Sequence, residues 1–126
     1  MSIQQILVID DEDDLRNLIQ TCLELMGGWQ VLSANCGKEG LLKAQTEQPD
    51  AILLDVMMPQ MDGFATLQQL RANTTTQHIP VILLTAKGRS LDQNQLTQLN
   101  VRGTISKPFN PRKLVDQVLM LLSETN

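Results

Sequence analysis

The stretch ILVIDDEDD (residues 6–14) joins four consecutive apolar residues to five consecutive acidic ones. An uninterrupted apolar run is typical of a strand that is covered on both faces, because a strand with one exposed face alternates apolar and polar residues. The acidic run begins where this strand ends. Five like charges in a row usually indicate a solvated stretch, but this run lies between a buried strand and an apolar helical pattern. We therefore expect it to belong to a folded site.

A helix is predicted directly after the acidic run, and Gly27 and Gly28 end it. Its apolar residues recur at helical spacing and would form one inward-facing stripe, made of Leu15, Leu18, Ile19, Cys22, Leu23 and Met26. Residues 12–14 would fall in the first helical turn, where the helix dipole favours negative charge. Asp10 and Asp11 are then left as an acidic pair at the strand end.

The alternation of apolar run and helical pattern continues along the chain. Runs rich in Ile, Val and Leu predict strands at 6–9, 30–34, 51–56, 81–86 and 103–106. Helical patterns after the first helix cover 37–47 with Leu41, Leu42 and Ala44 inside, 62–72 with Asp62 as N-cap, 88–99, and a last helix after Pro111. Strands that alternate with helices through short connections form a parallel sheet covered on both faces. The sequence predicts a single α/β domain over 1–126, a three-layer sandwich with no output domain.

Composition excludes several classes of function. The net charge is −4 and no Lys/Arg cluster could follow a phosphate backbone, so we expect no direct nucleic-acid binding. No apolar run reaches the roughly 20 residues of a membrane span, so we expect no membrane contact and a cytoplasmic location. Cys22 and Cys36 are too few for a disulfide framework and are expected to be free thiols. Trp29 precedes the second strand and should lie at the end of the sheet away from the acidic pair.

The residues that could bind a metal or take part in a reaction lie at the strand ends. In parallel α/β sheets, ligands bind outside the carboxyl ends of the strands. The predicted strands end in Asp10, Asp11, Asp55, Thr85 and Lys107. Three carboxylates close together repel one another unless a cation joins them. Oxygen ligands with room for water suit Mg²⁺, and no His or Cys lies near enough in the pattern to indicate zinc.

The remaining strand-end residues suit a phosphoryl group. Lys107 supplies a positive charge and Thr85 a hydroxyl donor, and phosphoryl transfer depends mostly on positioning and charge neutralisation. A carboxylate can act as nucleophile and form an acyl phosphate. Asp55 is the best candidate because it is the lone acid after AILL on the middle strand.

These residues occur in motifs that resemble the receiver domain of bacterial two-component response regulators, over essentially the full chain. The matching stretches are VIDDE (8–12), ILLDVMMPQMDGF (52–64), PVILLTA (80–86) and SKPF (106–109). As a set in this order they are highly specific. The resemblance implies a flavodoxin-like, doubly wound (βα)5 fold with strand order 2-1-3-4-5, an order that the chemotaxis-regulator type of this family illustrates.

The resemblance also implies a role for each matched residue. Asp55 would accept the phosphoryl group from a histidine kinase or a phosphotransfer protein, and the domain would catalyse only its own phosphorylation and dephosphorylation, signalling through an unknown downstream protein. Magnesium would be bound by Asp11 directly, by Asp10 largely through water, by Asp55 and by the main-chain carbonyl of Met57. The phosphoryl oxygens would contact Thr85, Lys107 and the backbone N–H of Ala86. The Lys107–Pro108 bond would be cis.

Two alternatives remain open at this stage. A haloacid-dehalogenase-like phosphatase also pairs an Asp nucleophile with Mg²⁺, Thr and Lys, but it places a second Asp where this chain has Met57. A receiver-like interaction module could signal without phosphate. The family commonly has Tyr or Phe three residues before the lysine, and Thr104 occupies this switch position here. His78 lies in the polar stretch TTTQHIP and is expected to be a surface-loop residue and not a phosphocarrier.

Overall fold

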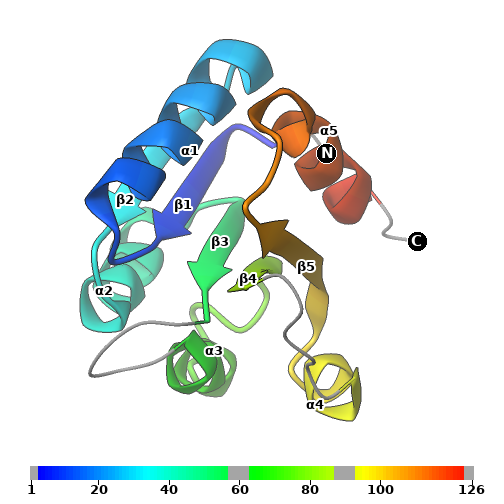
Figure 1. Cartoon of the computed structure of the whole chain (residues 1–126). Coiled ribbons are helices and arrows are strands. Elements are labelled where there is room, and N and C mark those ends of the chain that lie inside the picture. The colour runs from blue at the N-terminus through cyan, green and yellow to red at the C-terminus, as the bar shows by residue number, and fades with distance from the viewer. Residues whose placement is uncertain (1–2, 57–62, 87–92, 124–126) are drawn as a thin grey trace.

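The computed structural model describes residues 3–56, 63–86 and 93–123 of the 126-residue chain. Strands and helices alternate through these ranges (Figure 1). Their bounds in chain order are β1 (Gln5–Ile9), α1 (Asp13–Gly27), β2 (Gln30–Ala34), α2 (Gly37–Glu47), β3 (Ala51–Asp55), α3 (Gly63–Ala72), β4 (Val81–Ala86), α4 (Gln93–Gln98), β5 (Val101–Lys107) and α5 (Pro111–Ser123).

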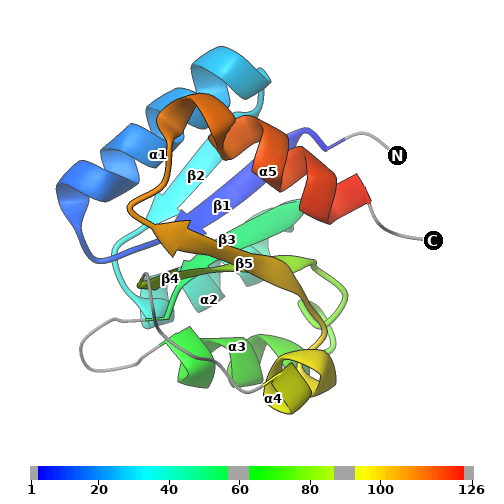
Figure 2. The same ribbon diagram turned by 45° about the vertical axis from the view of Figure 1, so that its right-hand side comes forward.

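The strands form one parallel sheet in the order β2-β1-β3-β4-β5. Helices α1 and α5 cover one face, and α2, α3 and α4 cover the other (Figures 1 and 2). The predicted fold class and strand order are therefore confirmed. This order puts β1 beside β3 at the centre of the sheet, so the residues that follow these two strands are neighbours.

The central strands are buried on both faces, which explains their continuous apolar runs. In β1, Ile6 and Val8 belong to the core beneath α1 and α5, whereas Leu7 and Ile9 belong to the core above α2, α3 and α4. All four side chains are fully buried. Successive side chains of a strand point to opposite faces, so one run of four apolar residues serves both cores.

Three residues predicted to face inward are exposed instead. Leu18 is 42% exposed and Met26 is 55% exposed, although both were assigned to the inward stripe of α1. Leu42 on α2 is 55% exposed as well. Leu18 immediately precedes the buried Ile19, and Leu42 immediately follows Leu41, which packs against the core. One position along a helix is a rotation of about 100°, so both side chains turn away from the sheet. Met26 lies in the last turn of α1, beyond the fully covered part of the stripe.

Several predicted boundaries shift. β3 ends at Asp55, one residue before the predicted end, and β5 is longer than the predicted 103–106 because it pairs with β4 from Val101 to Lys107. Only Gln93–Gln98 of the predicted helix 88–99 is helical within the described ranges. Glu12 is the N-cap of α1, with an extended backbone (φ −89°, ψ 110°), and not part of its first turn. Asp62, the predicted N-cap of α3, lies outside the described residues.

The amino ends of the strands lie at the edge opposite the acidic pair. Gln30, the first residue of β2, pairs with Gln5, the first residue of β1, whereas Asp10 follows the last residue of β1. Trp29 immediately precedes β2 and is buried, so its predicted placement is confirmed. Among the helices in the described ranges, none is both long and apolar enough to cross a membrane.

Candidate functional site

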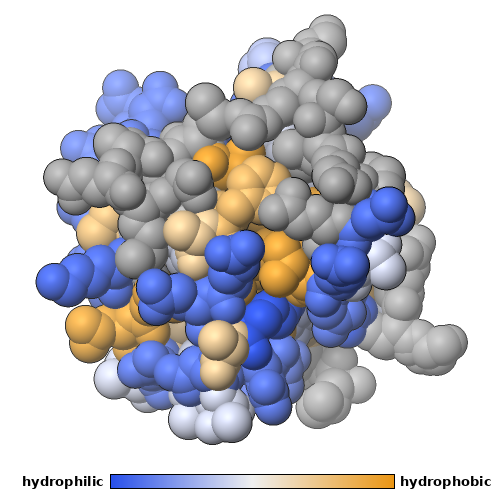
Figure 3. Space-filling view, turned by 90° about the horizontal axis from the view of Figure 1, so that it is seen from below, coloured by the Kyte–Doolittle hydropathy of each residue, from blue (hydrophilic) through white to orange (hydrophobic). Residues whose placement is uncertain are grey.

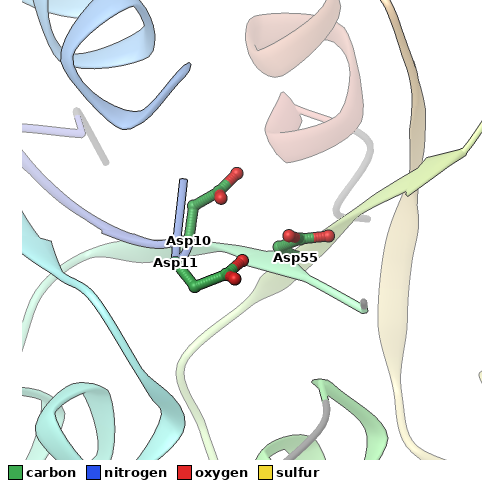
Figure 4. A group of neighbouring side chains, drawn as sticks. All are labelled: Asp10, Asp11 and Asp55. Atoms are coloured by element: carbon green, nitrogen blue, oxygen red, sulfur yellow. The ribbon is translucent and has the colours of Figure 1, made fainter. Parts of the chain in front are cut away.

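Three carboxylates converge where β1 and β3 end. Asp10 and Asp11 directly follow β1, and Asp55 is the last residue of the neighbouring β3. One oxygen from each carboxylate lies within 4.8 Å of the other two. Figure 4 shows the carboxylates of Asp10 and Asp11 both pointing to the side where Asp55 lies. Residues 44 positions apart in the sequence thus form one acidic cluster, which we define as Asp10, Asp11 and Asp55.

Asp10 is the most constrained member of this cluster. Its side chain is fully buried, its Oδ1 accepts the backbone N–H of Glu12 at 2.9 Å, and its Oδ2 is buried without a hydrogen-bond partner among the described residues. Burial, together with repulsion from the Asp55 carboxylate, raises the pKa of Asp10 from 3.8 to about 6. A buried carboxylate oxygen without a partner is costly, and a bound cation would satisfy it.

A cation and a hydroxyl lie at the same edge of the sheet. The Lys107 Nζ lies 3.2 Å from Oδ1 of Asp55 and forms an ion pair with this largely buried carboxylate. Thr85 is buried at the end of β4, and the register pairs Thr85 with Ser106 and Ala86 with Lys107. The Lys107–Pro108 peptide bond is cis, as predicted. The structure therefore brings Thr85, Ala86 and Lys107 to the edge that holds the acidic cluster.

Arg16, which no motif in the sequence singled out, fastens the turn that carries Asp10 and Asp11. Its Nη1 donates to the main-chain oxygen of Asp10 at 2.8 Å, and its Nη2 donates to Oδ1 of Asp13 at 2.7 Å. The available signal in the sequence was a lone basic residue two positions after the end of the acidic run, from which a long side chain can reach back.

The other predicted residues have varied surroundings. Thr104 is exposed on β5, opposite Leu83 in the register. Met57 lies outside the described residues. His78 is exposed in the connection between α3 and β4, as expected for a surface-loop histidine. Cys22 is buried and Cys36 is half-buried, and both are free thiols as predicted.

A groove on the helical face opposite α1 and α5 contains none of the residues of the site. Figure 3 views the molecule from below in the orientation of Figure 1, and shows hydrophilic side chains over much of the coloured surface with several apolar areas among them. A groove of about 620 Å³ lies between α2 and α3 and is lined by Leu41, Gln45, Gln68, Gln69, Ala72, Asn73 and Thr74. Its lining holds amides and a hydroxyl but no ionisable group.

The donor set of the acidic cluster fits a hard divalent cation. It offers carboxylate oxygens only, and Asp11 is exposed, so water can complete a coordination shell. The buried Oδ2 of Asp10 accepts no hydrogen bond from the described residues that would compete with a cation. Such a set is typical of a site that takes Mg²⁺ through a few carboxylates and several waters.

Comparisons with known proteins identify the family of this chain. The family model described as "Response regulator receiver domain" matches residues 6–119. The alkaline phosphatase synthesis transcriptional regulatory protein PhoP of Bacillus subtilis is 40% identical over 119 residues, which are 94% of this chain and 48% of that protein. The chain thus spans about half the length of the curated relatives it matches.

Solved structures share the fold over nearly all of this chain. Chemotaxis protein CheY4 of Vibrio cholerae has a TM-score of 0.85 at 28% identity, with 95% of this chain and 99% of that chain covered. The receiver domain of sensor histidine kinase PA1611 from Pseudomonas aeruginosa has a TM-score of 0.83 at 25% identity, with 98% and 100% covered, and it carries a magnesium ion coordinated in its active-site cleft. On its motifs, strand order and family match, the chain belongs to the response regulator receiver domains.

Proposed function

We propose that this domain is a phosphorylation-activated signalling receiver in which Asp55 accepts a phosphoryl group in a Mg²⁺-dependent reaction. The observation that carries the proposal is the convergence of Asp10, Asp11 and Asp55 within 4.8 Å, with Lys107 Nζ 3.2 Å from Asp55. An acidic cluster alone would bind a cation. The lysine on the third carboxylate adds a partner for a second anion, the phosphoryl group.

Each residue of the site has one proposed role. An oxygen of Asp55 attacks the phosphorus of the donor, the bond between phosphorus and the donor's leaving atom breaks, and an acyl phosphate forms. Lys107, Thr85 and the Ala86 N–H bind the phosphoryl oxygens. Asp10, Asp11, Asp55 and the Met57 carbonyl would hold Mg²⁺. When bound, Mg²⁺ supplies charge neutralisation between the carboxylates and the incoming phosphoryl oxygens.

The proposed donor is a histidine kinase or a phosphotransfer protein, and the signal leaves through a downstream protein or segment. We expected no direct nucleic-acid binding, and the comparisons give this expectation no support, because the relative from Bacillus subtilis is named as a transcriptional regulatory protein. That relative is about twice as long as this chain. We therefore propose that the output reaches DNA through a region or partner beyond the receiver fold, and that Thr104 replaces the usual aromatic in the switch.

Intact mass after incubation with acetyl phosphate and Mg²⁺ tests the assignment. The wild-type domain should gain a single phosphoryl adduct, which EDTA should prevent. Asp55→Asn should gain none, because an amide oxygen is too weak a nucleophile to form the acyl phosphate. Asp14→Asn is the matched control: it makes the same change at an exposed acidic residue of α1 and should be phosphorylated like the wild type.

The same experiment separates the alternatives. An adduct of equal size on Asp55→Asn would show that another residue accepts the phosphoryl group. Multiple turnover of a phosphate ester would favour the phosphatase alternative. No adduct on the wild type, with Mg²⁺ bound, would favour an interaction module that signals without phosphate.

A further inference from the structure

The guanidinium of Arg16 links the end of β1 to the start of α1. Its two terminal nitrogens donate to two different acceptors, the main-chain oxygen of Asp10 and the carboxylate of Asp13. The Arg16 side chain is only 15% exposed, whereas that of Asp13 is 76% exposed. Because a guanidinium presents its donors in a rigid planar fork, two such contacts fix the direction in which the chain leaves the strand.

The acidic cluster requires the chain to leave the strand at this position. Consecutive residues of a continuing strand point to opposite faces, so Asp10 and Asp11 could not both reach Asp55 from a regular strand. Their carboxylates nevertheless point to the same side (Figure 4). The Asp10 N–H still donates to the Ala34 oxygen of β2 at 3.1 Å, but the Asp10 carbonyl accepts from Arg16. Within Asp10, the N–H therefore still bonds to the sheet, whereas the carbonyl already bonds to Arg16.

We infer that Arg16 is a positioning residue for the metal site, which holds Asp10 and Asp11 in the geometry that binds Mg²⁺. The inference rests on the proposed function, since it assumes that the acidic cluster is the Mg²⁺ site. Arg16 contacts neither the metal nor the phosphoryl group. Loss of partners that orient metal ligands typically lowers metal affinity 10–100-fold. Arg16 holds the main chain of a ligand and not its carboxylate, so we expect an effect of about tenfold.

Calorimetric titration with Mg²⁺ tests the role of Arg16. Arg16→Met should raise the Kd for Mg²⁺ about tenfold, and at saturating Mg²⁺ it should be phosphorylated at the wild-type rate. Arg16→Lys keeps the charge but cannot bridge two acceptors as a fork, so it should also lose most of the affinity. Arg112→Met is the matched control: it removes the same charge from an exposed arginine on α5 and should bind Mg²⁺ like the wild type.

Each outcome decides one point. Wild-type affinity in Arg16→Met would overturn the inference, and wild-type affinity in Arg16→Lys would show that charge alone matters and overturn the argument from the fork. Urea unfolding in EDTA checks that the variants fold. Should Arg16→Met not fold, Asp13→Ala removes the second guanidinium contact at an exposed position. Asp13→Ala should also weaken Mg²⁺ binding, and wild-type affinity in this variant would count against the inference. If the wild type itself binds no Mg²⁺, the proposed function fails. If the wild type binds Mg²⁺ and the Arg16 variants bind it with the same affinity, this inference alone fails.

Discussion

At the residue scale, Asp10 shows how a site destabilises the fold that carries it. Its raised pKa of about 6 means that the folded state holds this proton more tightly than the unfolded chain does. Without metal, the stability of the domain should therefore fall as the pH rises from about 4 to about 6, by an amount on the order of 3 kcal/mol for a shift of this size.

Asp10→Asn tests this pH dependence, because an amide has no charge to bury. In EDTA at pH 7.5, the free energy of unfolding from urea titration should be higher for Asp10→Asn than for the wild type, by about 2–3 kcal/mol. At pH 4 the two proteins should be similar, since the wild-type carboxyl is then protonated in the folded state. Asp14→Asn, at an exposed position of α1, should change little at either pH. A less stable Asp10→Asn at pH 7.5 would contradict the assignment.

At the element scale, the start of α3 packs directly on the end of β3. A Cβ added to Gly63 would lie 2.4 Å from the main-chain oxygen of Asp55 and 2.4 Å from the Cα of Val56. The Gly63 N–H also donates to the Val56 oxygen at 3.2 Å. Backbone cannot rotate away as a side chain can, so any larger residue must push α3 or the proposed phosphoacceptor out of place.

Gly63→Ala should therefore lower both stability and phosphorylation. We expect a loss of about 1–3 kcal/mol in the free energy of unfolding, the usual cost of overpacking, and a slower gain of the phosphoryl adduct at saturating Mg²⁺. Gly103→Ala is the matched control, because its Cβ would meet a methyl group of Leu121, which can change rotamer, at 2.5 Å. It should cost less stability and leave the adduct unchanged. Wild-type behaviour of Gly63→Ala in both measurements would refute this close approach.

At the scale of the whole molecule, sequence patterns predict the elements whose residues are buried. They do not predict contacts that a long side chain makes with a distant main-chain group. The doubly buried runs around Ile6 and Leu53 predict a parallel sheet because only such a sheet covers both faces of a strand. Because ligands bind outside the carboxyl ends of parallel strands, the sequence then predicts that Asp10, Asp11 and Asp55 lie together. Residues beside the buried stripe of a helix are harder to assign, because an apolar residue there, such as Leu18, can be exposed. The contact of Arg16 with the Asp10 carbonyl depends on how the chain turns after β1, and no local pattern encodes that turn.

The separation of the two edges of the sheet gives a last prediction. Trp29, the single tryptophan of the chain, is buried at the amino edge of the sheet, while the acidic cluster lies at the carboxyl edge. Its main-chain N–H donates to the main-chain oxygen of Leu23 at 3.3 Å. The close-packed residues 6–9 of β1, whose side chains are fully buried, lie between the two edges, so a cation that binds locally should leave the surroundings of the indole unchanged. Tryptophan fluorescence should therefore stay constant through a Mg²⁺ titration that calorimetry shows to reach saturation. Urea unfolding should change the same signal and so prove that it is responsive. Quenching that follows the calorimetric binding curve would show that Mg²⁺ binding rearranges the sheet as a whole and not only its carboxyl edge.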